Sequence, residues 1–170
     1  YYLMAPQDWI WGLKHGVQRI RNSVTAIFSV FPQEAAFYRN ANVPVIEMGH
    51  PLLDMLPKLS KAEARERLGI KTSAQVICWM PGSRKHEVKR LLPVLKQVQF
   101  IFPKNCVHLR PQVADFMVHD DIWPEVHSIS QAQRYLAILA ADVVIGASGN
   151  MVLESALLAT PVIALYQVSA

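Results

Sequence analysis

The alternation of apolar runs with helical patterns constrains the fold of this chain more than any other feature. Runs of about five β-rich apolar residues alternate with longer stretches of helical periodicity, which is typical of βαβ units around a parallel sheet. The pattern predicts strands over residues 24–30, 43–48, 76–80, 142–146 and 161–165. We therefore expect an α/β fold built on parallel sheets.

The predicted helices cover residues 32–38, 61–68, 85–97, 130–141 and 151–159. The start of the second is well marked, because Ser60 and Glu63 have the spacing of a capping box. Residues 98–128 are harder to assign, since several prolines divide them into short pieces. Strand-like runs within this region lie at 98–102 and 107–109.

The domain organisation is predicted from a polar, charged segment at residues 57–72. This segment is expected to connect two domains, one ending at about residue 56 and the other covering residues 73–170. The sequence begins without Met and stops just past the predicted strand at 161–165, whereas a compact domain seldom ends on an uncovered interior strand. We therefore expect an internal part of a longer protein, incomplete at both ends.

The composition indicates a folded domain without a membrane span. Hydrophobic residues make up 52% and charged residues 18%, which excludes a disordered segment. The longest apolar stretch is interrupted by Asp142, Glu154 and Pro161, whereas a spanning helix needs roughly 20 largely apolar residues. The net charge of +4 is dispersed and accompanies no nucleic-acid-binding motif, so nucleic acid is not an expected partner.

The cysteines and histidines predict no metal site and no cofactor. Cys78 and Cys106 lie in strand-like runs, which favours buried thiols in a reducing cytoplasm over a disulfide framework. The six histidines are scattered without metal-ligand spacing, and no arrangement for nucleophilic catalysis is evident.

Residues 143–154 form the first candidate site. A predicted buried strand passes through small residues into a predicted helix, and glycines here allow a ligand close to the backbone. The free amides of a first helical turn, together with the helix dipole, favour an anion. The sequence therefore predicts a phosphate-binding turn at Ser148, Gly149 and Asn150.

Glu154 follows Asn150 by four residues, which puts both on one side of the predicted helix. A carboxylate at that position can accept hydrogen bonds from ribose hydroxyls. A purely structural alternative stays open, in which Ser148 or Asn150 caps the helix and Glu154 complements its dipole.

The second candidate site follows the predicted strand at 76–80. Gly82 and Ser83 form a turn that opens a helix, again with amides expected to be free. The planar guanidinium of Arg84 can bind phosphate oxygens and stabilise the charge of a departing diphosphate. The alternative is that Arg84 is an ordinary surface arginine.

Two tryptophans near the start, Trp9 and Trp11, form a weaker candidate. Residues two apart cannot both lie on one face of a helix, so one of them can line a cleft. A role in the core is the alternative.

Taken together, these motifs resemble the bacterial lipid-A-disaccharide synthases, and the Ala5-Pro6-Gln7 form of the first motif is closer to cyanobacterial members. The similarity lies in an ordered series of short motifs across nearly the whole chain outside 98–128. The motif residues are Tyr1, Tyr2, Pro6, Trp9, Trp11, Phe31, Pro32, Glu34, Phe37, Tyr38, Val43, Pro44, Gly49, His50, Pro51, Asp54, Pro81, Gly82, Ser83, Arg84, Glu87, Ser148, Gly149, Leu153, Glu154, Pro161 and Tyr166.

The resemblance implies a GT-B glycosyltransferase with two facing Rossmann-like domains, residues 1–56 ending the acceptor-side domain and 73–170 belonging to the donor-side domain. The implied reaction transfers a diacylated glucosamine from UDP to a diacylglucosamine phosphate, with inversion and without a metal. Arg84 would face the diphosphate, Ser148 and Gly149 the phosphates, and Glu154 the ribose. The implied protein is cytoplasmic, peripheral on the inner membrane, and binds a lipid-linked sugar acceptor.

Two departures from the family pattern leave alternatives open. Asn150 stands where the family usually has threonine, and the region 98–128 is shorter and richer in proline than expected. The family's proposed base, an aspartate, would lie upstream of Tyr1, so no catalytic residue is assigned and we expect the chain alone to be inactive. The alternatives are a UDP-sugar epimerase of the same architecture and a non-catalytic descendant that binds nucleotide or a partner protein.

Overall fold

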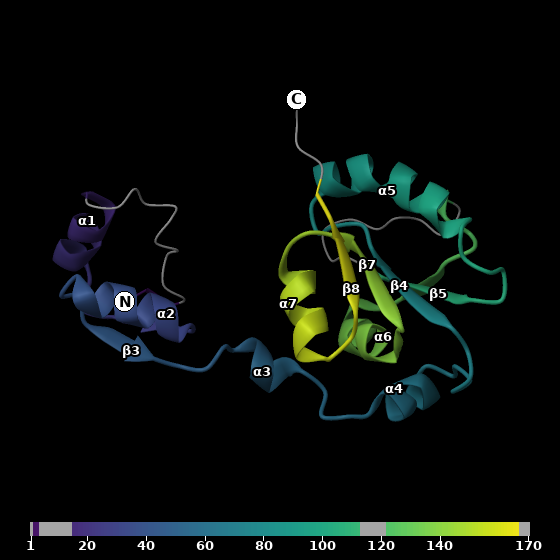
Figure 1. The fold of residues 1–170 in the computed structure, drawn as a ribbon, viewed down its shortest axis with the longest axis horizontal. Helices are drawn as coiled ribbons and strands as arrows, with labels where there is room; N and C mark the ends of the chain where they lie inside the picture. Colours follow the sequence, from purple (N-terminus) through teal and green to yellow (C-terminus); the bar gives the residue numbers. More distant parts are fainter. Residues whose placement is uncertain (1, 4–14, 113–121, 167–170) are drawn as a thin grey trace. The chain divides into compact units, whose positions relative to one another are not determined.

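The structure of the protein is a computed structural model that describes residues 2–3, 15–112 and 122–166 (Figure 1). It divides into two compact units, Tyr1–Met55 and Leu56–Ala170. The predicted α/β class is confirmed, because both units contain parallel sheets.

The first unit contains a three-stranded parallel sheet in the order β1-β2-β3. Its elements in chain order are β1 Tyr2–Leu3, α1 His15–Ser23, β2 Ile27–Ser29, α2 Pro32–Asn40, β3 Val45–Glu47 and α3 Leu52–Met55. The strands and the helix predicted at residues 24–48 are present, with both strands shorter than expected. Apolar residues of α1 and α2, including Ile20 and Tyr38, surround the buried Ile27 of β2.

The second unit contains a five-stranded parallel sheet in the order β6-β5-β4-β7-β8. Its strands are β4 Val76–Met80, β5 Val107–Pro111, β6 His127–Ile129, β7 Val143–Ala147 and β8 Val162–Leu165. Its helices are α4 Lys61–Arg67, α5 Lys85–Gln99, the 3-10 helix η3 Gln131–Gln133, α6 Arg134–Ala140 and α7 Asn150–Leu157.

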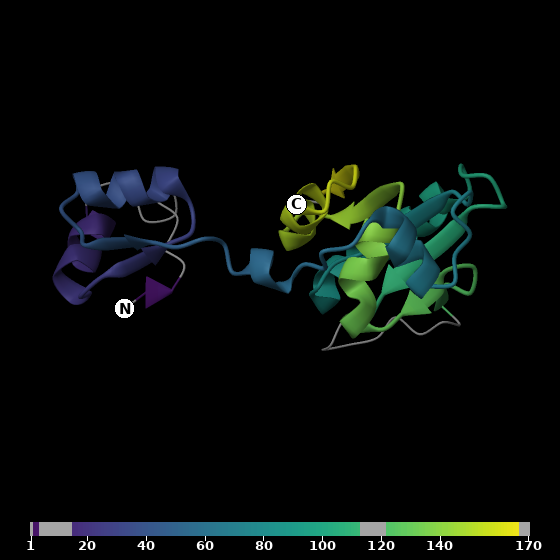
Figure 2. The same cartoon turned by 90° about the horizontal axis from the view of Figure 1, so that it is seen from below.

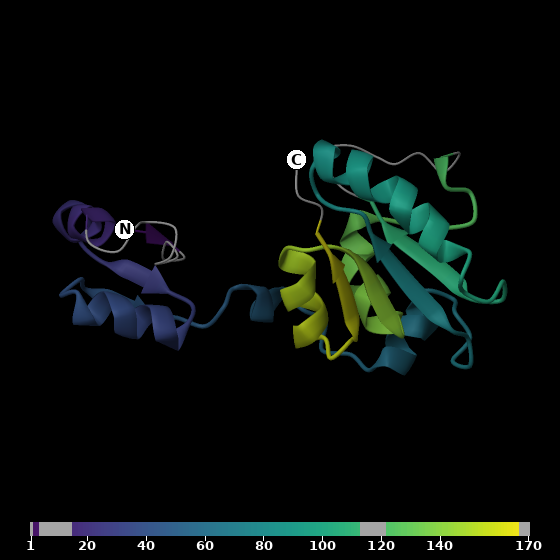
Figure 3. The same cartoon turned by 45° about the horizontal axis from the view of Figure 1, so that its top comes forward.

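Helices cover both faces of this sheet, as expected of a Rossmann-like unit (Figure 3). Alternate residues of the central strand β4 pack in opposite directions. Cys78 packs in the cluster that contains Ile138 of α6 and Met151 of α7. Trp79 packs in the opposite cluster, with Leu95 of α5. Of the two thiols predicted to be buried, Cys78 is buried, which raises its pKa to about 12, and Cys106 is partly exposed.

The segment expected to connect two domains, 57–72, lies within the second unit and carries α4. The predicted capping box is present, since the Glu63 amide donates to the Ser60 hydroxyl at 3.2 Å and the Ser60 amide donates to Glu63 at 2.7 Å. Helix α4 lies alongside α6, where Ala64 packs with Leu139 (Figure 2). This segment is therefore an integral part of the second unit's helical layer.

The region that the sequence left uncertain differs from the prediction in two ways. No strand forms at 98–102, because α5 continues to Gln99 and turns follow it. Gln99 is buried and accepts a hydrogen bond from the indole of Trp123, which holds the end of α5 in the core. The predicted strand at 107–109 is confirmed as β5, and β6 at the sheet edge is an addition.

Gly146 of β7 lies close to the backbone of β4, and replacing it should destabilise the second unit. Gly146 of β7 pairs with Met80 of β4, and a Cβ atom at this glycine would overlap the Met80 carbonyl group. Because main chain cannot move aside as a flexible side chain can, Gly146→Ala is expected to lower the free energy of unfolding by about 3 kcal/mol. Urea unfolding followed by tryptophan fluorescence measures the change.

The matched control is Gly149→Ala in the following turn, where a Cβ atom would meet nothing within 4 Å. It should change the free energy of unfolding by less than about 1 kcal/mol. Equal stability of the two variants would contradict the steric explanation.

Candidate functional site

The two turns singled out in the sequence meet at one edge of the five-stranded sheet. The turn at residues 81–84 follows β4, and the turn at 148–149 follows β7. Since β4 and β7 are neighbouring parallel strands, their carboxyl ends lie side by side. This edge is where open α/β sheets bind their ligands.

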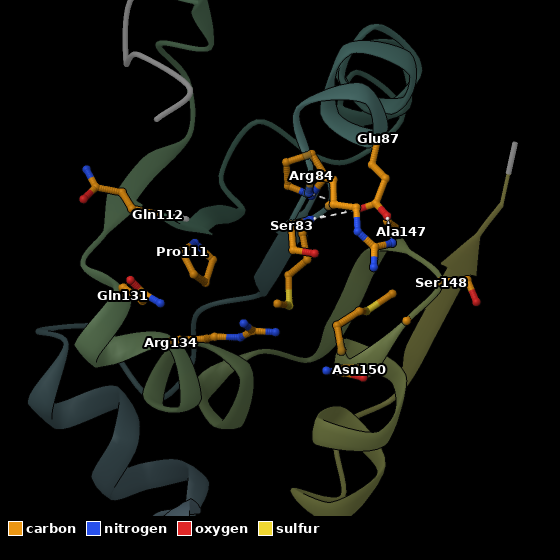
Figure 4. Close-up of a pocket in the computed structure, with 15 residues that line it drawn as sticks. Ser83, Arg84, Glu87, Pro111, Gln112, Gln131, Arg134, Ala147, Ser148 and Asn150 are labelled. Atoms are coloured by element: carbon orange, nitrogen blue, oxygen red, sulfur yellow. Dashed lines mark hydrogen bonds and ion pairs between the residues drawn. The ribbon is translucent and has the colours of Figure 1, made fainter. Parts of the chain in front are cut away.

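A pocket opens between the two turns (Figure 4). It is lined by both turns and by residues from the ends of β5, η3 and α6. Six of the seven predicted site residues line it, namely Gly82, Ser83, Arg84, Ser148, Gly149 and Asn150. The structure thus brings together two groups of residues more than sixty positions apart in the sequence.

The amides of the first turn are not free, contrary to expectation. The Glu87 carboxylate accepts hydrogen bonds from the Ser83 amide at 2.9 Å and the Arg84 amide at 3.1 Å. Burial raises the pKa of Glu87, but the amides of Ser83 and Arg84 and the Arg84 charge outweigh this effect and lower it. Gly82 permits the turn with a φ of 130°, and a side chain there would overlap Glu87.

Arg84 also lies on the surface of this turn. Its guanidinium donates to Glu87 at 3.2 Å, and its side chain is 72% exposed. An ion pair this exposed contributes little, because water screens both charges. The Arg84 side chain can therefore exchange Glu87 for an anionic ligand at small cost.

The second turn begins α7 without a side-chain cap. Gly149 is the N-cap residue, and among the described residues neither the Ser148 nor the Asn150 side chain makes a capping hydrogen bond to α7. The structural alternative, in which one of these side chains caps the helix, is therefore wrong. The Ser148 amide donates to the Leu165 carbonyl of β8 at 2.7 Å, which fixes the turn on the sheet. The Ser148 and Asn150 side chains remain exposed at the pocket.

Glu154 lies beneath the pocket rather than at its surface. It is 5% exposed, and it is not among the described residues that line the pocket. Its carboxylate forms an ion pair with the guanidinium of Arg134, at the start of α6. Asn150 is exposed on the same helix, so the shared side predicted for the two residues does not give them a shared environment.

The pocket residues that were not predicted include three polar side chains from outside the two turns, Arg134, Gln112 and Gln131. Gln112 follows β5, and its side chain donates to the Ser128 hydroxyl of β6 at 3.0 Å. A correct assignment of β5 and β6 would have predicted that their ends lie at this edge. Arg134 was hidden inside the helix predicted at 130–141, which divides into η3 and α6 just before this residue.

The segment with Trp9 and Trp11 lies outside the described residues. Within ranges 2–3, 15–112 and 122–166, no group of three or more metal-ligating His, Cys, Asp or Glu side chains is found. In the same ranges, no helix is long and apolar enough to cross a membrane.

The whole chain is similar to one group of enzymes. The family model described as lipid-A-disaccharide synthetase matches residues 1–170. Proteins named lipid-A-disaccharide synthase include those of Syntrophus aciditrophicus, at 35% identity over 100% of this chain and 47% of the relative. That of Synechocystis sp. is 34% identical over 99% of this chain and 46% of the relative. The chain spans about half the length of the curated relatives it matches. It therefore belongs to the lipid-A-disaccharide synthetase family.

Proposed function

We propose that the complete protein is an inverting glycosyltransferase of lipid A biosynthesis. It transfers a diacylated glucosamine from its UDP donor to a diacylglucosamine phosphate acceptor. The second unit supplies the donor-nucleotide site, and the first unit belongs to the acceptor-side domain. The reaction uses no metal or cofactor of its own.

One observation carries this proposal beyond family membership. Two strand–turn–helix junctions from neighbouring parallel strands meet around one pocket that also contains Arg84. The backbone amides at the uncapped start of α7 and the guanidinium of Arg84 are groups that bind a diphosphate. The charge that develops on the leaving UDP is stabilised by the same groups.

The proposed roles follow the position of each residue. The side chains of Ser83 and Arg84, presented by the turn at Gly82, bind the diphosphate from one side, and Ser148, Gly149 and Asn150 bind it from the other. Glu154 contacts the ribose, and its ion pair with Arg134 permits this because that pair uses only Oε2 of the carboxylate. The catalytic base belongs to a part of the protein outside this chain.

The acyl chains of both substrates favour a protein that works at a membrane surface. We propose a cytoplasmic enzyme that associates with the inner membrane and reaches its lipid-linked acceptor there. Nucleic acid is not proposed as a partner, since the positive charges of the chain form no continuous patch in the sequence.

The test is an assay of the complete gene product with UDP-diacylglucosamine and diacylglucosamine phosphate. We expect equal amounts of UDP and of a disaccharide whose new linkage is inverted relative to the donor. Epimerised UDP-sugar without disaccharide would replace the proposal with an epimerase. Binding of UDP without turnover would replace it with a non-catalytic binding protein.

A further inference from the structure

Arg134 and Glu154 form an ion pair to which the proposed function assigns no role. Arg134 is the first residue of α6, and Glu154 lies in the second turn of α7. The Glu154 side chain is 7% exposed, whereas that of Arg134 is 28% exposed. The pair is therefore asymmetric: the carboxylate is enclosed, and the guanidinium lines the pocket.

The enclosed carboxylate fixes the position of the arginine. A buried carboxylate without a compensating charge is strongly destabilising, so Glu154 holds the guanidinium against α7. Figure 4 shows Arg134 extending from α6 toward the turn that carries Asn150. The ion pair thereby restricts both side chains and gives Arg134 a defined direction.

The guanidinium of Arg134 has N–H donors that the ion pair does not use. An arginine carries five N–H groups, and the contact with Glu154 uses the Nη2 group. The Arg134 Nε atom is buried and has no hydrogen-bond partner among the described residues. A buried donor without a partner is costly, so a ligand oxygen that accepts from this group gains free energy.

We propose that Arg134 binds an anionic oxygen of the nucleotide diphosphate, and that Glu154 positions its guanidinium. This inference rests on the proposed function of the pocket. Arg84 is the exposed arginine of the first turn, and Arg134 is the fixed arginine that lines the pocket from α6. The nucleotide diphosphate is then held by both.

The test measures dissociation constants of the complete protein for UDP and uridine. Arg134→Gln should weaken UDP binding about tenfold or more, as loss of a charged hydrogen bond does. It should change uridine binding less than about twofold, because uridine has no anionic group. Arg134→Lys, which keeps the charge and loses the fork, should fall between. The control is Arg90→Gln, an exposed arginine of α5 outside the pocket lining, which should bind as the unaltered protein does.

Glu154→Gln separates positioning from direct contact. If Glu154 positions Arg134, this variant weakens UDP binding more than uridine binding, because only UDP carries the anionic oxygen. In the double variant Arg134→Gln with Glu154→Gln, the further loss relative to Arg134→Gln alone should be the same for UDP and uridine. The double variant also removes both members of the buried pair, so it leaves no unpaired charge if a single variant folds poorly.

Two results would overturn the inference. One is unchanged UDP binding by Arg134→Gln, and the other is equal weakening of UDP and uridine binding by Glu154→Gln. Both leave the proposed function intact. Failure of the unaltered protein to bind UDP would instead reject the proposed function itself.

Discussion

Arg65→Met is expected to lower the free energy of unfolding of the second unit by about 3 kcal/mol, because it leaves a buried network without its donor. The Arg65 side chain is 7% exposed and donates to the Ala140 carbonyl at 2.9 Å and the Thr72 carbonyl at 2.5 Å. It also donates to both carboxylate oxygens of Asp142, at 3.0 and 2.9 Å. Methionine preserves the length of the side chain but none of these hydrogen bonds.

The position of this network explains the size of the effect. Asp142 also accepts a hydrogen bond from the Val76 amide at 2.8 Å, where β4 begins. Arg65 therefore links α4, the end of α6 and the central strand of the sheet through one side chain. The Asp142 side chain is 45% exposed, so water compensates it in part and the expected loss stays near the low end for a broken buried pair.

Urea unfolding followed by tryptophan fluorescence measures this loss, since Trp79 and Trp123 are fully buried in the second unit. Arg67→Met is the matched control, an exposed arginine on the same helix, and should change the free energy of unfolding by less than about 0.5 kcal/mol. Equal effects of the two substitutions would show that the network contributes nothing specific.

The stability difference between Arg65→Met and the unaltered protein should also depend on pH. Burial raises the pKa of Asp142, but the Lys61 and Val76 hydrogen bonds and the charges of Lys61 and Arg65 outweigh it and lower the pKa. A carboxylate with a lowered folded-state pKa contributes stability above its unfolded pKa, about 3.9, and loses it as the pH falls through the folded value. The stability difference between Arg65→Met and the unaltered protein should therefore shrink below about pH 4.

The framework of the second unit could be predicted because its signals are local. Strand β4 has the predicted bounds, since five consecutive apolar residues before a glycine turn have few other solutions. The capping box at Ser60 was equally reliable, because both partners lie within four residues. The same spacing relates Arg84 to Glu87, and it could have predicted that Glu87 occupies the amides of the first turn.

What could not be predicted depends on contacts between distant segments. The ion pair of Arg134 and Glu154 joins two helices, and nothing in either helix indicates its partner. The apolar run at 98–102 has a strand-like composition, yet Leu91, Leu95 and Gln99 are spaced by four and are all buried. The helix therefore continues to Gln99 and buries that residue, whereas Phe100 and Ile101, which follow it, remain exposed.

Arg84→Ala in the complete enzyme is expected to reduce kcat by about 100- to 1000-fold, the usual effect of removing one donor from a charge that develops in the transition state. The substitution isolates the guanidinium from the turn that carries it. Glu87 binds the backbone amides of residues 83 and 84, and an alanine at position 84 retains that amide. The shape of the turn is therefore maintained while the charge is removed.

Comparison of kcat with KM tests how Arg84 acts. If the guanidinium binds the diphosphate equally before and during transfer, Arg84→Ala raises KM and leaves kcat unchanged, which would contradict stabilisation of the leaving group. Arg84→Lys keeps the charge but loses bidentate geometry, so its kcat should fall between the two. Lys85→Ala is the control, an exposed neighbouring cation outside the pocket lining, and it should retain full activity. A loss of activity in Lys85→Ala equal to that in Arg84→Ala would mean that the general positive charge of this segment, and not the arginine fork, acts on the diphosphate.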